Sequence, residues 1–245
     1  MYGLALLNSD YSGNAITVRR ASDNATQDIG FDGQDLDIAA LESFCTGTDG
    51  FVSVWFDQSG NGKNATQTTA SSQPKIVSAG SVILENGKPT IISDGVDDYL
   101  QSGIISFTNP VTMFMVNRKI SGANTMTGLN NGSSLIGFLS LSTGYVYYQQ
   151  GPQFSPNFGD NNQNLLYAKT STIGTDWALA SNSILATNSG ENVGTATPNQ
   201  ITISARGIGS QPMNAATQAF IVYDSDQSGN RTGIETALND YYNIF

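Results

Sequence analysis

The chain is dominated by short segments rich in β-branched and aromatic residues, each bounded by turn residues. Such segments favour β-strands, and many of them at short spacing are typical of a sandwich of antiparallel sheets. Because 245 residues fit one such sandwich and the composition does not shift along the chain, the sequence predicts a single domain over residues 1–245. The expected strands lie at residues 16–18, 51–56, 82–85, 88–92, 111–116, 135–141, 145–149, 165–169, 177–180, 184–187, 201–205 and 219–223.

Turn and capping residues predict a hairpin and two helices within this pattern. The pair Asn86-Gly87 is a favoured type I′ turn, so the segments on either side of it are expected to form a hairpin. Asp37 is expected to cap a helix over residues 38–44, which would pack as a short lid. Thr232 and Glu235 have the spacing of a capping box, which predicts a second helix close behind the last strand.

The strand expected over residues 51–56 runs directly into a dense turn over residues 57–62. Nearly every residue of this strand is apolar, which predicts burial on both faces. Asp57 and Ser59 can accept hydrogen bonds from nearby backbone amides, and the two glycines of the turn can adopt positive φ. These residues are typical of structural corners. A ligand-binding loop is the alternative, and the corner is the preferred interpretation.

The charge of the chain and the length of its apolar runs exclude two classes of partner. Ten basic and twenty acidic residues give a net charge of −10, and the pairs Arg19-Arg20 and Arg118-Lys119 are isolated. Since nucleic-acid binding requires a strong basic patch, no nucleic-acid partner is expected. No run approaches the roughly 18 apolar residues of a membrane-spanning helix, so no membrane insertion is expected.

The chain has no histidine and a single cysteine, Cys45. These counts exclude His-dependent catalytic triads and an intrachain disulfide, and they make most zinc sites implausible. Residues 224–235 do have the spacing of an EF-hand calcium loop, with Glu235 at the twelfth position. An EF-hand requires an entering helix, whereas a strand is expected before this loop. Neither a metal nor another cofactor is therefore expected.

Several segments resemble known families. Residues 177–186, 201–206 and 219–224 are similar to the late strands of concanavalin A-like (laminin G-like) jelly rolls, and residues 94–100 resemble a strand-entry motif of that group. Residues 52–62 resemble more specifically the catalytic domain of family 54 α-L-arabinofuranosidases. Similar domains occur in surface and phage-related proteins of Bacteroidetes. The resemblance implies an all-β, concanavalin A-like jelly-roll sandwich, with a short lid helix and a C-terminal helix.

The resemblance also implies where catalytic carboxyl groups should lie. Retaining glycosidases need two of them about 5 Å apart. The family's nucleophile strand is matched here to residues 135–139, which contain no carboxylate, and the acid's turn to residues 207–211, with Gln211 in the acid's place. A glutamine cannot act as a general acid. Each of the four glutamates, Glu42, Glu85, Glu191 and Glu235, has a structural explanation, so no catalytic residue is expected.

Sugar recognition uses aromatic rings that stack on sugars and amides that bind hydroxyls. Tyr145, Tyr147, Trp177 and Gln211 are the predicted ligand-binding residues, with burial of the aromatic residues in the core as the alternative. The sequence thus predicts a non-catalytic carbohydrate- or host-surface-recognition module. Its expected place is a virion, as a fibre, spike or decoration protein, or the cell surface, and its expected partner is a glycan or host-surface receptor.

Two alternative functions belong to other classes. One is an arabinofuranosidase-like glycoside hydrolase whose carboxylates lie elsewhere in the chain. The other is a purely structural virion protein, which would assemble into homo-oligomers or particles. Activity on an aryl arabinofuranoside distinguishes the first alternative from the preferred interpretation.

Overall fold

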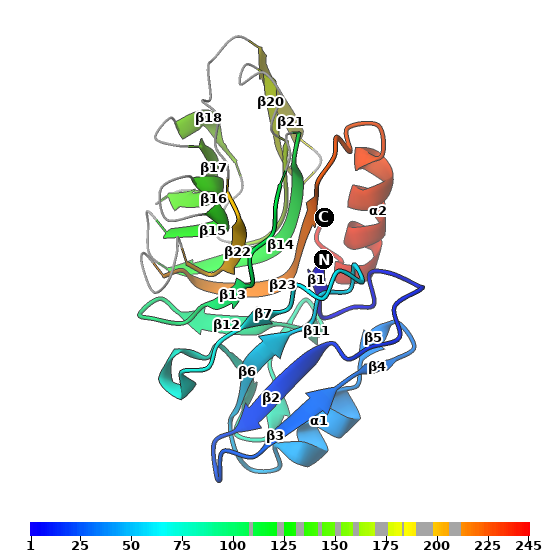
Figure 1. The fold of residues 1–245 in the computed structure, drawn as a ribbon, viewed down its shortest axis with the longest axis vertical. Coiled ribbons are helices and arrows are strands. Elements are labelled where there is room, and N and C mark those ends of the chain that lie inside the picture. Colours follow the sequence, from blue (N-terminus) through cyan, green and yellow to red (C-terminus); the bar gives the residue numbers. More distant parts are fainter. Residues whose placement is uncertain are drawn as a thin grey trace.

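Strands dominate the computed structural model, and its described residues include two α-helices, α1 (Ile38–Phe44) and α2 (Arg231–Tyr242), on the outside (Figure 1). The structure describes residues 1–107, 110–121, 125–130, 135–141, 144–149, 153–158, 162–169, 176–182, 184–189, 198–205 and 212–245. For several of these strand residues the description covers the backbone alone. No described helix is long and apolar enough to cross a membrane.

The first third of the chain forms the lower unit of Figure 1, in which short antiparallel strands curl beside α1. β2 (Ile16–Arg20) pairs with β3 (Thr26–Ile29) and with β6 (Gly50–Trp55). β6 also pairs with β7 (Ala65–Thr66) and β8 (Lys75–Ser78), and β8 pairs with β9 (Ser81–Val82). Two small hairpins, β4 (Phe31–Asp32) with β5 (Asp35–Leu36) and β10 (Leu84–Glu85) with β11 (Lys88–Pro89), complete this unit.

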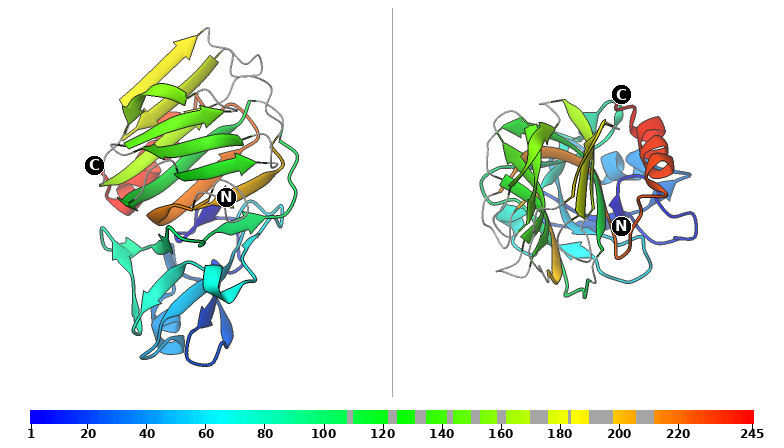
Figure 2. Two further views of the ribbon diagram at one scale, coloured as in Figure 1. Left: turned by 90° about the vertical axis from the view of Figure 1, so that its left-hand side faces the viewer. Right: turned by 90° about the horizontal axis from the view of Figure 1, so that it is seen from above.

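The rest of the chain forms two facing layers of antiparallel strands (Figures 1 and 2). The first layer runs in the order β21 (Ile184–Ser189), β20 (Asp176–Ser181), β19 (Gln163–Lys169), β14 (Thr112–Ser121), β23 (Asn214–Tyr223). The second runs in the order β18 (Gln153–Phe158), β17 (Gly144–Gln149), β16 (Leu135–Leu141), β15 (Thr125–Asn130), β22 (Gln200–Ile203), β13 (Leu100–Ser102).

Short strands join both layers to the lower unit. β12 (Ile91–Asp94) pairs with β23 and with β8, and β13 pairs with β7. β1 (Tyr2–Gly3) adds a further antiparallel pair to β23. The base of the sandwich is therefore continuous with the lower unit through hydrogen-bonded strands.

Alternation along β14 divides the apolar side chains between two cores. Met113 and Met115 lie in the core between the two layers, whereas Phe114 and Val116 belong to the core beneath α2. All four are fully buried, and the two methionines fill the core between the layers. Seen from above in Figure 2, the layer containing β20 and β21 lies between the other layer and α2.

Local sequence signals explain several elements. The side chain of Asp37 accepts a hydrogen bond from the backbone amide of Ala40, which confirms the predicted cap of α1. Asn86 and Gly87 both have positive φ, as a type I′ turn requires. The predicted capping box of α2 is wrong. The N-cap of α2 is Asn230 and not Thr232. Glu235, which the motif would place at the start of the helix, is buried beside Arg231.

The expectation for residues 51–56 is wrong in one respect. In β6 only Val52 and Trp55 of the apolar side chains are buried, because a bulge opposite β2 shifts the alternation between them. On the outer face of β6, long polar side chains lie over Phe51: the guanidinium carbon of Arg19 is 4.8 Å and the ammonium of Lys75 is 5.5 Å from its ring centroid. The strand is therefore half-buried.

Candidate functional site

The turn after β6 is organised by the carboxylate of Asp57, which is almost fully buried. It accepts hydrogen bonds from the Ser59 amide (3.0 Å), the Ser59 hydroxyl (2.7 Å) and the Lys63 amide (3.2 Å), and it contacts the Met1 amino group (2.8 Å). Burial alone would raise the pKa of this carboxyl, but the Met1 charge and the hydrogen bonds hold that pKa below its usual value. Gly60 and Gly62 have positive φ, as the sequence predicted.

The neighbouring residue, Gln58, fastens the first strand and its following segment to this turn. Its side chain is fully buried; its amide nitrogen donates to the carbonyls of Gly3 (2.9 Å) and Ala5 (3.0 Å). Its carbonyl oxygen accepts from the Leu7 amide at 2.7 Å. Buried amides paired in this way fix the backbone that they bind. The preferred interpretation of the turn as a structural corner is therefore confirmed for both Asp57 and Gln58.

A cavity of about 360 Å³ opens on the outer side of the turn, where the lower unit meets the sandwich; we call it the junction pocket. One wall is polar: the turn and the segment after β23 contribute hydroxyl, amide and charged groups. The other wall is apolar and comes from the segment after β13 and from β22 and β23. The lining residues of the pocket are Met1, Tyr2, Asp57, Ser59, Asn61, Lys63, Ile105, Ser106, Phe107, Ile201, Val222 and Asp224.

The polar groups of the junction pocket differ in how they are engaged. The Ser59 hydroxyl donates to Asp57 and accepts from the Asn61 side-chain amide at 3.1 Å, which fixes the direction of both groups. Lys63 is held through its backbone, since its amide donates to Asp57 and its carbonyl accepts from the Tyr2 hydroxyl. Within the described ranges, the Lys63 ammonium makes no ion pair.

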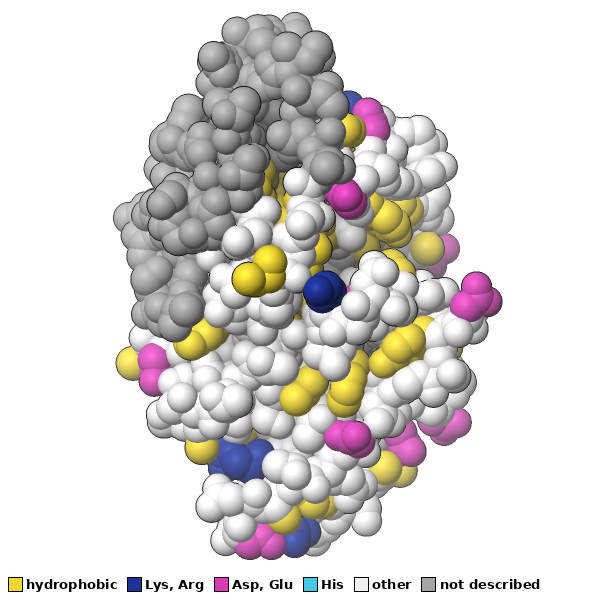
Figure 3. Space-filling model, in the orientation of Figure 1, with side chains coloured by type: hydrophobic (Ala, Val, Ile, Leu, Met, Phe, Trp, Pro, Cys, Tyr) yellow, Lys and Arg dark blue, Asp and Glu magenta, His cyan; other side chains and the backbone are white. Residues whose placement is uncertain are grey.

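The space-filling view in Figure 3 shows the distribution of side chains on the face of the molecule that Figure 1 presents. Acidic and basic side chains are spread singly over it, and hydrophobic side chains lie between polar atoms across its middle. Neither charge gathers into a large patch among the described residues on this face. A surface of this kind suits uncharged polar ligands better than polyanions.

An acidic cluster at the entry to β13 is a structural turn. Asp94, Asp97 and Asp98 bring one carboxylate oxygen each within 4.8 Å of one another. Asp98 accepts from the Asp94 amide (3.0 Å), Asp94 from the Val96 amide (2.7 Å) and Asp97 from the Ser72 hydroxyl (2.8 Å). Burial, reinforced by the two neighbouring carboxylates, raises the pKa of Asp98 to about 6.

The loop over residues 224–235, which has the spacing of a calcium site, uses its acidic groups within the protein. Asp226 accepts from the Ser228 amide (2.8 Å) and from the Lys169 ammonium (3.0 Å), and the Ser228 hydroxyl is the main cause of its pKa falling to about 2. Glu235 lies buried on α2, 3.5 Å from the Arg231 guanidinium. The element before the loop is the strand β23, as the sequence predicted.

The glutamates that the structure describes are likewise engaged in holding the fold. Glu42 on α1 accepts from the Val82 amide at 3.0 Å, which attaches that helix to β9. Glu85 forms an ion pair with Arg118 at 2.8 Å, and Glu235 is placed as above. Glu191 lies outside the described residues. The structural explanations predicted for Glu42 and Glu85 are confirmed, whereas Glu235 pairs with Arg231 and does not form the predicted capping box.

The predicted ligand-binding residues fall on both layers of the sandwich. Tyr145 and Tyr147 lie on β17, with Tyr147 opposite Phe138 of β16, and Trp177 lies on β20 in the other layer. The structure describes the backbone of these three residues and not their side chains, and Gln211 lies outside the described residues. Their role in binding stays a prediction.

Of the two segments matched to catalytic positions, the structure describes only the first. Residues 135–139 lie on β16, where Ile136 and Phe138 are buried in the core between the layers. Residues 207–211 lie outside the described residues.

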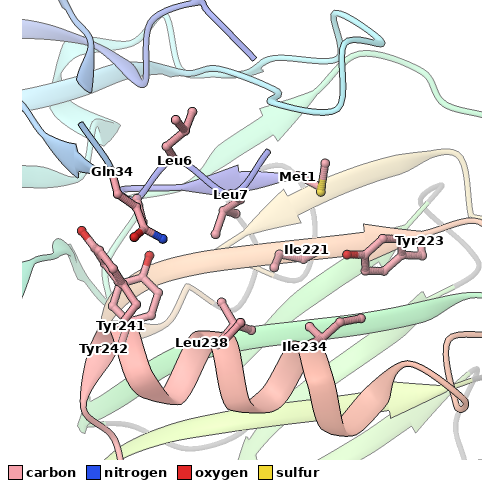
Figure 4. A pocket seen from close by; sticks show the side chains of 12 residues that line it. Met1, Leu6, Leu7, Gln34, Ile221, Tyr223, Ile234, Leu238, Tyr241 and Tyr242 are labelled. Carbon is pink, nitrogen blue, oxygen red and sulfur yellow. The ribbon is translucent and has the colours of Figure 1, made fainter. Parts of the chain in front are cut away.

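A second cavity, of about 170 Å³, lies beneath α2 (Figure 4). In that view Ile234 and Leu238 from α2 point toward Leu7 and Met1, and Ile221 of β23 lies between the two groups. Its walls are largely apolar, and its few polar groups include Gln34 and the hydroxyls of Tyr241 and Tyr242. This cavity is a gap in the second core and offers few groups that could orient a polar ligand.

Each of three comparisons with known proteins finds similarity to arabinofuranosidases. The family described as "Alpha-L-arabinofuranosidase B, catalytic" matches residues 4–90, which form the lower unit. A probable α-L-arabinofuranosidase B of Aspergillus fumigatus is 44% identical over 63 residues, which are 25% of this chain and 12% of that protein. An arabinofuranosidase solved with arabinofuranosyl-α-1,2-xylobiose superposes with a TM-score of 0.75 at 16% identity, over 98% of this chain and 62% of that chain. The chain has the GH54 β-sandwich fold.

A second solved structure supports the same assignment of the fold. It is a GH54 α-L-arabinofuranosidase soaked with a cyclic sulfate inhibitor, with a TM-score of 0.74 and 15% identity over 96% of this chain and 62% of that chain. The chain thus spans less than two thirds of the length of these relatives. The predicted all-β jelly-roll sandwich is confirmed, as is its resemblance to the GH54 domain. The expected occurrence in surface or phage-related proteins of Bacteroidetes is not shown.

The expectation of a non-catalytic recognition module, such as a virion fibre, spike or decoration protein, is wrong. The expected location of the protein at a cell surface stays a prediction. Both the matching family and the curated relative are arabinofuranosidases, and nothing supports a virion, phage or adhesion role. The expectation rested on two matches of short segments, residues 135–139 and 207–211. At about 16% identity such matches do not fix register, and a slip of one residue moves every side chain of a strand to the other face.

The junction pocket itself was missed from the sequence. Asn61 and Lys63 stand in the same turn as Asp57, and their polarity was a usable signal. Ser106 and Phe107 come more than forty residues later, in a segment without a turn or strand motif. Only the pairing of β13 with β7 brings that segment beside the turn.

Proposed function

We propose that this chain is a catalytic domain of the α-L-arabinofuranosidase B type, which hydrolyses the bond between an α-L-arabinofuranosyl unit and the glycan that carries it. The observation that carries the proposal is the family match over residues 4–90, reinforced by the segment that is 44% identical to the Aspergillus fumigatus protein. The fold of the whole described chain supports it further, because the two GH54 structures cover nearly all of this chain.

The match lies on residues that hold the architecture together. Residues 4–90 include the Asp57 turn, the buried Gln58 and the helix α1. Gln58 and Glu42 of α1 bind backbone groups that are distant in sequence, and Asp57 binds the backbone of its own turn. Such residues lie at the base of the two layers, one of which contains β16 and β17 and the other β20. A rigid base of this kind supports a catalytic constellation, which must be held within a fraction of an ångström.

The chemistry requires two carboxyl groups on either side of the scissile bond. A retaining enzyme uses one as nucleophile and the other as acid and then base, about 5 Å apart. Glu42, Glu85 and Glu235 are engaged in the fold, and a carboxylate committed to an ion pair or a backbone amide is a poor nucleophile. Glu191 is therefore the glutamate to test first, with Asp160 and Asp176 as candidate partners.

The direct experiment follows the release of L-arabinose from arabinofuranosyl-α-1,2-xylobiose. The proposal predicts arabinose and xylobiose as products, and it predicts that Glu191→Gln abolishes the release while Glu42→Gln leaves the activity of the folded protein unchanged. The latter is a matched control because Glu42 binds a backbone amide on the far side of the lower unit. Absence of arabinose release by the folded chain, over a range of pH, would refute the proposal.

A further inference from the structure

We infer that the junction pocket is a second carbohydrate subsite, which binds a neutral pentose unit of the glycan that carries the arabinofuranosyl group. The inference rests on the proposed function for the choice of glycan, and on the pocket's own chemistry for the rest. Its ligand class follows from three features: the balance of charge, the arrangement of hydroxyl-reading groups and the apolar wall.

The charges in the pocket favour an uncharged ligand. Lys63 and Asp224 bring opposite charges to the same lining, and the third charged group, Asp57, is saturated by hydrogen bonds from its own turn and by the Met1 amino group. A phosphate or a uronic acid would gain from Lys63 and lose against Asp224. A neutral ligand with hydroxyl groups can donate to the carboxylate and accept from the ammonium at once.

The remaining polar groups are suited to hydroxyls. The side-chain amide of Asn61 donates to Ser59, which leaves its carbonyl oxygen directed away from that bond. The exposed Ser106 adds a hydroxyl, which can donate or accept, from the opposite segment. Vicinal sugar hydroxyls need donors and acceptors side by side, and the pocket supplies both from two segments.

The apolar side of the pocket fits the non-polar face of a sugar ring. Ile105, Phe107 and Val222 are half-buried in its wall, so each presents part of its surface to the cavity. An aromatic ring against the C–H face of a sugar is a recurrent mode of carbohydrate binding. The volume of about 360 Å³ lies near the small end of ligand pockets, which suits a short oligosaccharide.

The polar wall is preorganised. Asp57 fixes the amides of Ser59 and Lys63, and the Tyr2 hydroxyl holds the Lys63 carbonyl. A ligand therefore meets a backbone that is already ordered, so binding does not require the ordering of a loop.

The test is a titration of the whole chain with xylobiose, followed by amide chemical shifts and calorimetry. We expect the shifts to concentrate on residues 59–63 and 105–107. Lys63→Gln and Phe107→Ala should each weaken xylobiose binding about tenfold. Lys63→Gln should leave the melting temperature nearly unchanged, whereas Phe107→Ala should also lower it because Phe107 packs against the core. Lys88→Gln is the matched control, because Lys88 pairs with Asp35 away from the pocket and its loss should leave affinity unchanged.

Digalacturonate and inorganic phosphate are the competing probes. Tighter binding of either than of xylobiose would overturn the assignment to a neutral sugar. Lack of xylobiose binding at millimolar concentration, or unchanged affinity in both pocket variants, would overturn the site itself. Xylobiose binding in the pocket without any arabinose release would refute only the proposed hydrolysis, whereas release with no pocket binding would refute only this inference.

Discussion

Replacing Gln58 by alanine tests whether this side chain stabilises the fold by holding the first segment of the chain against the turn after β6. The side chain is fully buried and joins the turn to the segment that contains Gly3, Ala5 and Leu7. Alanine keeps the backbone of the turn but removes both the donor and the acceptor. The change therefore affects the link between the two segments and leaves the hydrogen bonds of Asp57 in place.

The magnitude follows from the groups that lose their partner. The Leu7 amide and the two carbonyls would be left inside the protein, and a buried polar group without a partner costs about 1–3 kcal/mol. Gly3 and Ala5 take part in β-pairs, which can partly satisfy their carbonyls. We therefore assign a smaller free-energy cost to these two carbonyls than to the Leu7 amide. The vacated volume adds a smaller term. We expect a loss of about 3–5 kcal/mol, a large fraction of the roughly 5–15 kcal/mol that stabilises a typical domain.

The assay is equilibrium unfolding in urea, read by tryptophan fluorescence, since Trp55 lies in the same core. Gln27→Ala is the matched control: Gln27 is exposed on β3, and its loss should change stability by less than about 0.5 kcal/mol. A loss below about 1 kcal/mol in Gln58→Ala, with an unchanged urea dependence, would show that the first segment is not held by this side chain.

Three further changes test other parts of the structure. Because burial raises the pKa of Asp98 from 3.8 to about 6, the folded state binds its proton more tightly than the unfolded state. Stability should therefore fall by up to about 3 kcal/mol as pH rises from well below 3.8 to well above 6, and Asp98→Asn should remove that fall in melting experiments. Gly128→Ala would place a Cβ 2.2 Å from the Ile136 carbonyl, so we expect about 2–4 kcal/mol of destabilisation by urea unfolding, against no loss for Gly103→Ala, which meets open space. Glu235→Gln removes the charge beside Arg231 and should lower stability by about 2–4 kcal/mol, whereas an unchanged melting temperature would show the pair to be unimportant.

Much of the fold follows from local sequence. The helix α1 and the hairpin at Asn86 were predicted because capping and turn residues act within a few positions of themselves. The short strands β7, β8 and β13 were not predicted. Each is two to four residues long and is defined by its partners, which are distant in sequence. The burial of β6 was overestimated, because a bulge changes the side-chain alternation without any signal in composition.

Of the candidate site, only the turn at Asp57 was predictable from the sequence. Asp57 could be recognised because all its hydrogen bonds except that from the Met1 amino group come from residues of the same turn or next to it. Gln58 carries the long-range connection, yet its partners are backbone groups some fifty residues away, which sequence does not reveal. The capping box of α2 shows the converse case. Glu235 has the expected spacing, but the charge of Arg231 one turn earlier attracts its side chain into the protein instead.

Hydrolysis of 4-nitrophenyl α-L-arabinofuranoside tests the central claim most directly, because a single linkage is cleaved and the product is coloured. The proposed function predicts a steady release of 4-nitrophenol by the folded chain, well above that of a heat-denatured sample, and no comparable release from the 4-nitrophenyl β-D-xylopyranoside. A folded protein with a cooperative melting transition that leaves the arabinofuranoside intact at every pH would contradict the assignment as an arabinofuranosidase domain.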